Sequence, residues 1–199
     1  DQTYMTLGVD NNFELSDNLI AEYTFDENVG VSNDELAAYY KLDGNANDNS
    51  INTNNGTTVD IDYVSGINYK AAKFNGINSR IVVTDDSSIQ NVFNNGGSVS
   101  VWLNVFSDGG LDLGGIIDKR AGGTISGWLL YLKTEVAGYC GINFYKDFSS
   151  NQGRWYTTTN DIALNEWYHV VLTYDSSSVS NDPNIYINGN NIPITEVNT

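Results

Sequence analysis

Oxygen-bearing side chains alternate along a short stretch of the sequence that begins at Asp43. Asp43, Asn45 and Asn47 occupy alternate positions, and Asp48 adds a second carboxylate. Hard oxygen donors in a glycine-containing loop suit Ca²⁺, which accepts about six to eight oxygen ligands, main-chain carbonyls included. The pattern therefore predicts a structural calcium site at Asp43, Asn45, Asn47 and Asp48. The alternative is a solvated loop of Asx turns that holds no ion.

Aromatic residues with polar neighbours form a second group of candidates. Sugar recognition needs an exposed aromatic ring beside groups that form hydrogen bonds. The candidates for such a ligand site are Trp155, Tyr156, Tyr131, Tyr139 and Arg154. The competing interpretation of each aromatic residue is core packing. We assign Trp102, Trp167 and Trp128 to the core.

Catalytic residues are harder to find. His169 is the one histidine, and no serine or cysteine partner stands near it in the sequence, so we interpret it as a structural residue. Cys140 is the one cysteine, which excludes an intrachain disulfide, and its surroundings indicate a buried thiol in a strand. Zinc is excluded because this single His and single Cys are far apart. No catalytic residue is predicted.

Composition narrows the possible partners. The 199 residues are 40% hydrophobic, which is enough for a packed core. The formal net charge is −16, from 25 acidic and 9 basic residues, so the surface as a whole repels nucleic acids and anionic membranes. No run of 18 apolar residues occurs, and we expect no membrane insertion. Divalent cations and sugars remain compatible partners.

The elements that would position these residues are short β-strands. Within 98–106, Val99, Val101, Leu103 and Val105 alternate with polar and aromatic residues, which is typical of a central strand. Asn188-Gly189 predicts a tight hairpin, since a type I′ turn needs two residues with positive φ. Further strands are predicted at 38–42, 70–74, 80–84, 115–118, 128–133, 140–145, 154–158, 167–174, 184–187 and 190–192. Many short strands with frequent turns indicate an all-β sandwich.

From Ala37 onward, an ordered set of motifs resembles the laminin-G-like (LamG-type) family of the concanavalin A-like lectin/glucanase superfamily. The matching segments are Tyr39-Tyr-Lys-Leu-Asp-Gly-Asn-Ala-Asn-Asp48, Asn55-Gly-Thr57, Ala72-Lys-Phe-Asn-Gly76, Ser98-Val-Ser-Val-Trp102, Glu166-Trp-Tyr-His-Val-Val-Leu-Thr-Tyr174 and Ile185-Tyr-Ile-Asn-Gly189. Each motif alone is weak, but their order is specific. The resemblance implies an antiparallel two-sheet jelly-roll sandwich over residues 37–199 that recognises carbohydrate or protein.

The resemblance also implies what to expect of catalysis and calcium. Retaining glucanases of this superfamily carry a Glu-x-Asp-x-x-Glu or Glu-x-Asp-x-Glu strand, which sets two carboxylates about 5 Å apart. Asp60-Ile-Asp62 alternates carboxylates but lacks the glutamate partner. The chain is therefore predicted not to be an enzyme. Related domains often hold a structural Ca²⁺ between the first-strand loop and a closing strand, which agrees with the calcium site predicted above.

The two ends of the sequence depart from the family pattern. Domains of this kind finish with a closing strand, and the sequence reaches Thr199 without one. We expect a C-terminally truncated domain that belongs to a larger polypeptide. The alternatives are that the segment around 19–25, or another subunit, covers the open edge. Residues 1–36 are predicted to be an N-terminal extension or the end of a preceding module.

Together these features predict a non-catalytic binding or adhesion module that recognises carbohydrate. Its expected setting is a larger extracellular, cell-surface or virion protein, such as a fibre or attachment protein. The alternative is a purely structural virion or surface-assembly domain that contacts other protein subunits and binds no glycan. The expected partners are accordingly a glycan or other protein subunits.

Overall fold

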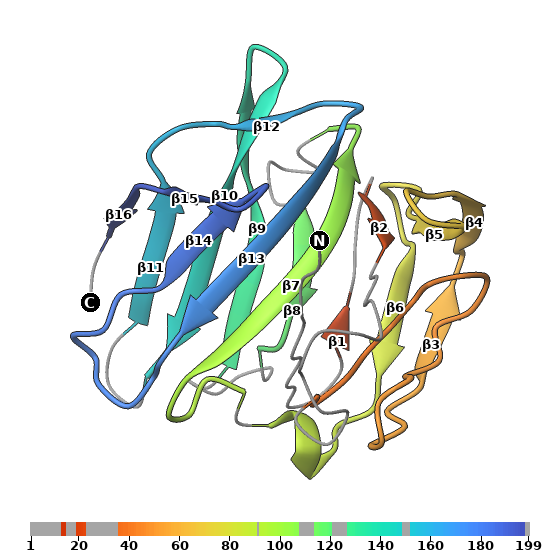
Figure 1. Cartoon of the computed structure of the whole chain (residues 1–199), viewed down its shortest axis with the longest axis horizontal. Coiled ribbons are helices and arrows are strands. Elements are labelled where there is room, and N and C mark those ends of the chain that lie inside the picture. Colours follow the sequence, from red (N-terminus) through yellow and green to blue (C-terminus); the bar gives the residue numbers. More distant parts are fainter. Residues whose placement is uncertain are drawn as a thin grey trace.

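The chain forms two stacked antiparallel sheets (Figure 1). The computed structural model describes residues 13–14, 19–22, 36–90, 92–107, 114–120, 127–148 and 152–197. In this part of the chain the regular structure is β-strand, apart from a 3-10 turn at Ser87–Ile89, and no α-helix occurs. The all-β jelly-roll fold class predicted from the sequence is confirmed.

One sheet has nine strands and the other has seven. The order in the nine-stranded sheet is β16 (Ile194–Glu196), β11 (Gln152–Thr157), β10 (Tyr139–Asp147), β9 (Gly127–Val136), β8 (Gly115–Asp118), β1 (Phe13–Glu14), β6 (Arg80–Val83) and β3 (Gly56–Val59), with β12 (Ile162–Ala163) paired to β10. The order in the seven-stranded sheet is β15 (Asn190–Ile192), β14 (Asn184–Ile187), β13 (Trp167–Tyr174), β7 (Gly97–Val105), β2 (Leu19–Glu22), β5 (Lys70–Lys73) and β4 (Asp62–Ser65).

The core lies between the two sheets and follows from alternation along each strand. In β10, Ile142 and Phe144 are fully buried core residues, so the residues between them face away from the core. Aromatic rings connect the layers. Phe144 of β10 stacks on Trp155 of β11 at a centroid distance of 5.7 Å, and Tyr174 of β13 lies 5.4 Å from Trp155. These contacts fix the nine-stranded sheet against the seven-stranded one.

Two of the predicted core tryptophans lie elsewhere. Trp128 is 3% exposed and belongs to the core, as predicted. Trp102 and Trp167 are half-buried, and both alternate with core residues of β7 and β13, so their side chains lie on the outer face of the seven-stranded sheet. Their strands do pair directly, but assigning their side chains to the core is wrong, because alternation turns them outward.

The N-terminal residues contribute strands to both sheets. β2 pairs with β7 on one side and β5 on the other, and β1 lies between β8 and β6. The sequence predicts an extension or separate module over 1–36, but these two parts of it belong to the sandwich. The sequence also left open whether the segment around 19–25 covers an otherwise open edge; Leu19–Glu22 lies inside the seven-stranded sheet.

Two local predictions have different outcomes. Asn188 and Gly189 both have positive φ, 49° and 81°, which confirms the tight hairpin between β14 and β15. Residues 38–42 do not form the predicted strand: Tyr40 makes an isolated bridge to Asp48 instead. Among the described residues, none forms a helix of the length and apolarity required to cross a bilayer.

Candidate binding face

The Asp43 loop is organised around the carboxylate of Asp48. Oδ1 accepts hydrogen bonds from the main-chain N–H groups of Tyr39 (2.7 Å) and Ser50 (2.8 Å). Oδ2 accepts from the Ser50 hydroxyl and from the Asn54 N–H, each at 2.8 Å. Asp48 is 6% exposed. Both oxygens are therefore occupied by protein donors, and the carboxylate holds the loop together itself.

The other predicted calcium ligands lie at the surface of this loop. Asp43, Asn45 and Asn47 are exposed, and the Asn45 amide oxygen accepts the Asn47 N–H at 2.9 Å in an Asx turn. In the described part of the chain, no group of three or more His, Cys, Asp and Glu side chains is placed to hold a metal. In this geometry Asp48 has no acceptor position left for an ion, because protein donors take both oxygens, and the calcium site stays a prediction.

Trp155, one of the five predicted ligand residues, belongs to the core. It is fully buried, and its indole Nε1–H donates to Asp182 Oδ1 at 2.8 Å. Gly153 leaves room for the ring, since a Cβ there would lie 2.1 Å from a ring carbon of Trp155. The prediction that Trp155 forms an exposed platform is wrong, because alternation in β11 sends it inward and Tyr156 outward.

Tyr131 and Tyr156, two of the other candidates, lie in one cross-strand row on the outer face of the nine-stranded sheet. In the strand register Asn143 of β10 lies opposite Tyr131 of β9 on one side and Tyr156 of β11 on the other. Directly opposed residues have Cβ atoms about 5 Å apart. Tyr131 is 7% exposed and Asn143 3%, although neither belongs to the core cluster. An amide thus lies between two phenol rings on one side of a rigid sheet.

The next row of the same face adds a hydroxyl and a guanidinium. Tyr145 of β10 lies opposite Arg154 of β11, and both face away from the core. The Tyr145 hydroxyl donates to Asp147 Oδ1 at 2.5 Å. Burial raises the pKa of Tyr145 to about 12, and the hydrogen bond to Asp147 adds to this effect, so the phenol stays protonated. We call the set Tyr131, Asn143, Tyr145, Arg154 and Tyr156 the tyrosine face.

Charged side chains frame the tyrosine face. The Lys133 ammonium lies 5.0 Å from the centroid of the Tyr156 ring and donates to the Thr157 carbonyl at 3.1 Å. Arg120 makes two hydrogen bonds to the carboxylate of Asp118, at 2.9 and 2.5 Å. Arg154 is exposed, and its guanidinium has no hydrogen-bond or ion-pair partner within the described residues, although its main-chain carbonyl accepts the Val197 N–H at 2.7 Å. The guanidinium of Arg120 is thus neutralised and that of Arg154 is not.

Tyr139, the remaining candidate, lies apart from the others. It is 48% exposed and pairs with Val136 beside the turn that joins β9 to β10. Four positions along β10 separate it from Asn143, which corresponds to roughly 13 Å. The structure therefore brings Tyr131, Tyr156 and Arg154 together, leaves Tyr139 at the edge and places Trp155 inside.

Sequence reasoning missed Asn143 and Tyr145. The signal for them was present, because they alternate with the apolar residues Ile142 and Phe144 along one strand. Their common face with Tyr131 and Tyr156 depends on the register between three strands, and strand patterns alone do not give that register.

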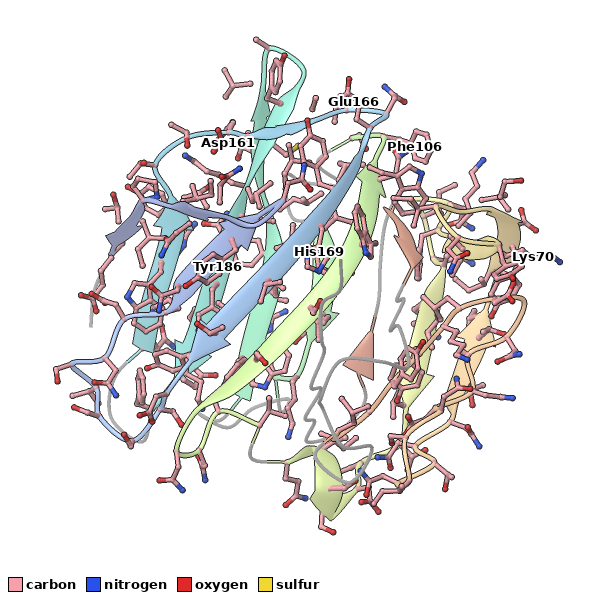
Figure 2. The ribbon with its side chains drawn as sticks, in the orientation of Figure 1. Lys70, Phe106, Asp161, Glu166, His169 and Tyr186 are labelled. Carbon is pink, nitrogen blue, oxygen red and sulfur yellow. The ribbon has the colours of Figure 1, made fainter. Side chains whose placement is uncertain are left out.

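The outer face of the seven-stranded sheet has a different character. Figure 2 looks onto this sheet and labels His169 on β13 and Tyr186 on β14. His169 Nε2 hydrogen-bonds the Ser100 hydroxyl at 2.8 Å, and its ring lies 5.1 Å from that of Trp102. Burial lowers the pKa of His169 to about 4, so its imidazole is neutral at pH 7. We call Trp102, Trp167, His169 and Tyr186 the tryptophan face.

A comparison with known protein families agrees with this two-sheet architecture. A laminin G family model, described as the concanavalin A-like lectin/glucanases superfamily, matches residues 74–199. The chain belongs to this family. Laminin-G-like domains are generally binding domains without catalytic activity, although the superfamily includes glucanases. No curated protein and no solved structure matches the chain.

Proposed function

We propose that this laminin-G-like chain is a non-catalytic carbohydrate-binding module of a larger extracellular or virion protein, and that the tyrosine face binds the sugar. The observation that carries the proposal is the placement of Asn143 between Tyr131 and Tyr156 in one cross-strand row. A pyranose ring has an apolar C–H face and a rim of hydroxyls. Phenol rings pack against the first, and an amide donates to and accepts from the second.

The rigidity of these side chains supports binding. All three come from paired strands in the middle of a sheet, and Lys133 covers one face of the Tyr156 ring. Groups that are already ordered lose little conformational entropy when a ligand binds. Shallow sugar sites gain affinity mainly in this way, since each contact contributes little.

The engagement of the neighbouring carboxylates supports a non-catalytic role. Glycoside hydrolysis by the usual route needs two carboxyl groups that flank the scissile bond, one acting as a proton donor. Asp147 accepts a hydrogen bond from the Tyr145 hydroxyl, and Asp118 accepts two from the Arg120 guanidinium. Each carboxylate therefore has a structural partner on this face. We expect no hydrolysis of the bound glycan.

The proposal is tested by glycan-array screening followed by calorimetric titration of the best ligand against the Tyr156→Ala variant. Loss of the ring should weaken binding at least about tenfold, which corresponds to ~1.4 kcal/mol. Tyr186→Ala is the matched control, because Tyr186 is a half-buried tyrosine of the opposite sheet. The proposal fails if no glycan binds, or if Tyr186→Ala weakens binding while Tyr156→Ala leaves it unchanged.

A further inference from the structure

Charge is distributed unevenly along the sequence of this chain. Residues 119–154 hold five of the nine Lys and Arg residues but two of the 25 Asp and Glu residues, so this segment has a formal charge of +3. The whole chain has a formal charge of −16. The segment includes β9, β10 and half of β11, which form most of the tyrosine face. Its cations are not equally available: Lys119 is 2% exposed and donates to the Gln90 carbonyl, and Asp118, just outside the segment, neutralises Arg120.

Arg154 is the cation of this face best placed to bind an anionic ligand. Within the described residues its guanidinium has neither an ion-pair nor a hydrogen-bond partner, whereas that of Arg120 on the same face is held by Asp118. It lies opposite Tyr145 across the strands and two positions from Tyr156 along β11. Two positions along a strand correspond to about 7 Å, roughly the width of one sugar ring. A sugar packed on Tyr156 would thus present its substituents to Arg154.

We infer that the tyrosine face prefers an acidic saccharide, with the carboxylate of a uronic acid paired to the Arg154 guanidinium. The inference rests on the carbohydrate-binding function proposed above. A guanidinium matches a carboxylate in a planar, two-bond arrangement, and hydrogen bonds between charged partners are stronger than neutral ones. The neighbouring Tyr145 hydroxyl is committed to Asp147, so Arg154 is the group that selects the charged substituent.

The test uses matched pairs of ligands. Oligosaccharides of galacturonate, glucuronate or mannuronate are titrated beside the same oligosaccharides in which each carboxylate has been reduced to the alcohol. The acidic member of one pair should bind about tenfold more tightly at low ionic strength. The difference should shrink as salt is raised, because exposed charges are screened.

Two variants assign the preference to a residue. Arg154→Gln should abolish the difference between the paired ligands, because the acidic ligand loses more affinity than the reduced one. Arg154→Lys should retain part of it, since the charge remains but the planar two-bond geometry does not. Lys70→Gln is the control for net charge: Lys70 is an exposed residue of β5 in the other sheet, labelled in Figure 2, and its removal should leave the preference unchanged.

The outcomes separate the two proposals. Equal binding of the acidic and reduced ligands, with both affinities reduced by Tyr156→Ala, overturns the acidic preference and leaves carbohydrate binding intact. A preference that survives in Arg154→Gln, or disappears equally in Lys70→Gln, also overturns it. Absence of binding to either member of every pair, and to the glycan array, overturns both.

Discussion

The tyrosine face and the tryptophan face are built by the same kind of strand on opposite sides of one sandwich, yet they offer different chemistry. The tyrosine face combines two phenol rings with an amide, a hydroxyl and an arginine whose guanidinium has no partner in the described part of the chain. The tryptophan face combines indole rings with an imidazole already paired to Ser100. In the described structure the first offers a ligand an uncommitted amide and an uncommitted guanidinium, whereas the second holds no cation and its imidazole is already paired.

Exposed aromatic rings alone therefore do not identify a sugar site. Trp102 is the larger ring and is half-buried on an outer face, but the imidazole of its neighbour His169 is committed to Ser100. Tyr156 has beside it an amide and a guanidinium whose hydrogen-bonding groups are uncommitted in the described structure. Because sugar binding depends on polar groups that are still free to form hydrogen bonds, the tyrosine face is the better candidate.

Trp155 faces inward and Trp102 faces outward, and this difference predicts the largest effect on the free energy of unfolding. Trp155→Ala should lower the free energy of unfolding by about 3 to 5 kcal/mol, because it opens a cavity beside Phe144 and leaves Asp182 without its indole donor. Trp102→Ala should cost about 1 to 2 kcal/mol, since that ring is already partly hydrated. Urea unfolding of both variants measures the difference. Equal losses would place both rings in the same environment.

The Asp43 loop provides the second test, because it was a rival candidate for a ligand site. Asp48→Asn should lower the free energy of unfolding by about 2 to 3 kcal/mol, since an amide has one acceptor oxygen for the four donors that now meet the carboxylate. Addition of EDTA to the unmodified chain should leave the melting temperature unchanged if Asp48 alone organises this loop.

Asp43→Asn is the matched control for that experiment, because Asp43 is exposed on the same loop and loses the same charge. It should change stability by less than about 0.5 kcal/mol. A fall in melting temperature on chelation that Asp43→Asn abolishes would restore the calcium site and contradict the interpretation of Asp48 as a purely structural carboxylate.

Alternation along single strands could be predicted from the sequence, and it accounts for most of the fold. The strands at β7, β9, β10, β13 and β14 were predicted close to their observed bounds, because apolar residues recur there with a period of two. The position of β1 was not predicted, and the segment that contains β2 was raised only as an alternative cover for an open edge. These strands are two and four residues long, and their partners are far away in sequence. No local pattern specifies such pairings.

The candidate site was predicted only in part for a related reason. Trp155 and Tyr156 are adjacent, so one of them must face inward, and the sequence does not say which until the register of β11 against β10 is known. Asn143 was overlooked because an asparagine in this Asn-rich chain is unremarkable by type. Its significance comes from the two tyrosines that lie opposite it in neighbouring strands.

The smallest expected effect is a dependence of stability on pH, and it arises from His169 on the tryptophan face. Its pKa is about 4 in the folded chain, against an ordinary value of 6.5, because burial disfavours the charged imidazolium. Between these values the unfolded chain binds the proton more readily than the folded chain. The contribution of the neutral imidazole to stability is therefore complete above about pH 6.5 and is lost as the pH falls towards 4.

The expected loss between pH 7 and pH 4 is about 1 to 3 kcal/mol. His169→Gln removes the titrating group while keeping a side chain that can bond Ser100, so the same acidification should cost this variant less by that amount. Urea unfolding at both pH values gives the four free energies required. If the two proteins lose stability in parallel, His169 is not shielded from water, and the tryptophan face is as open to hydration and ligands as the tyrosine face.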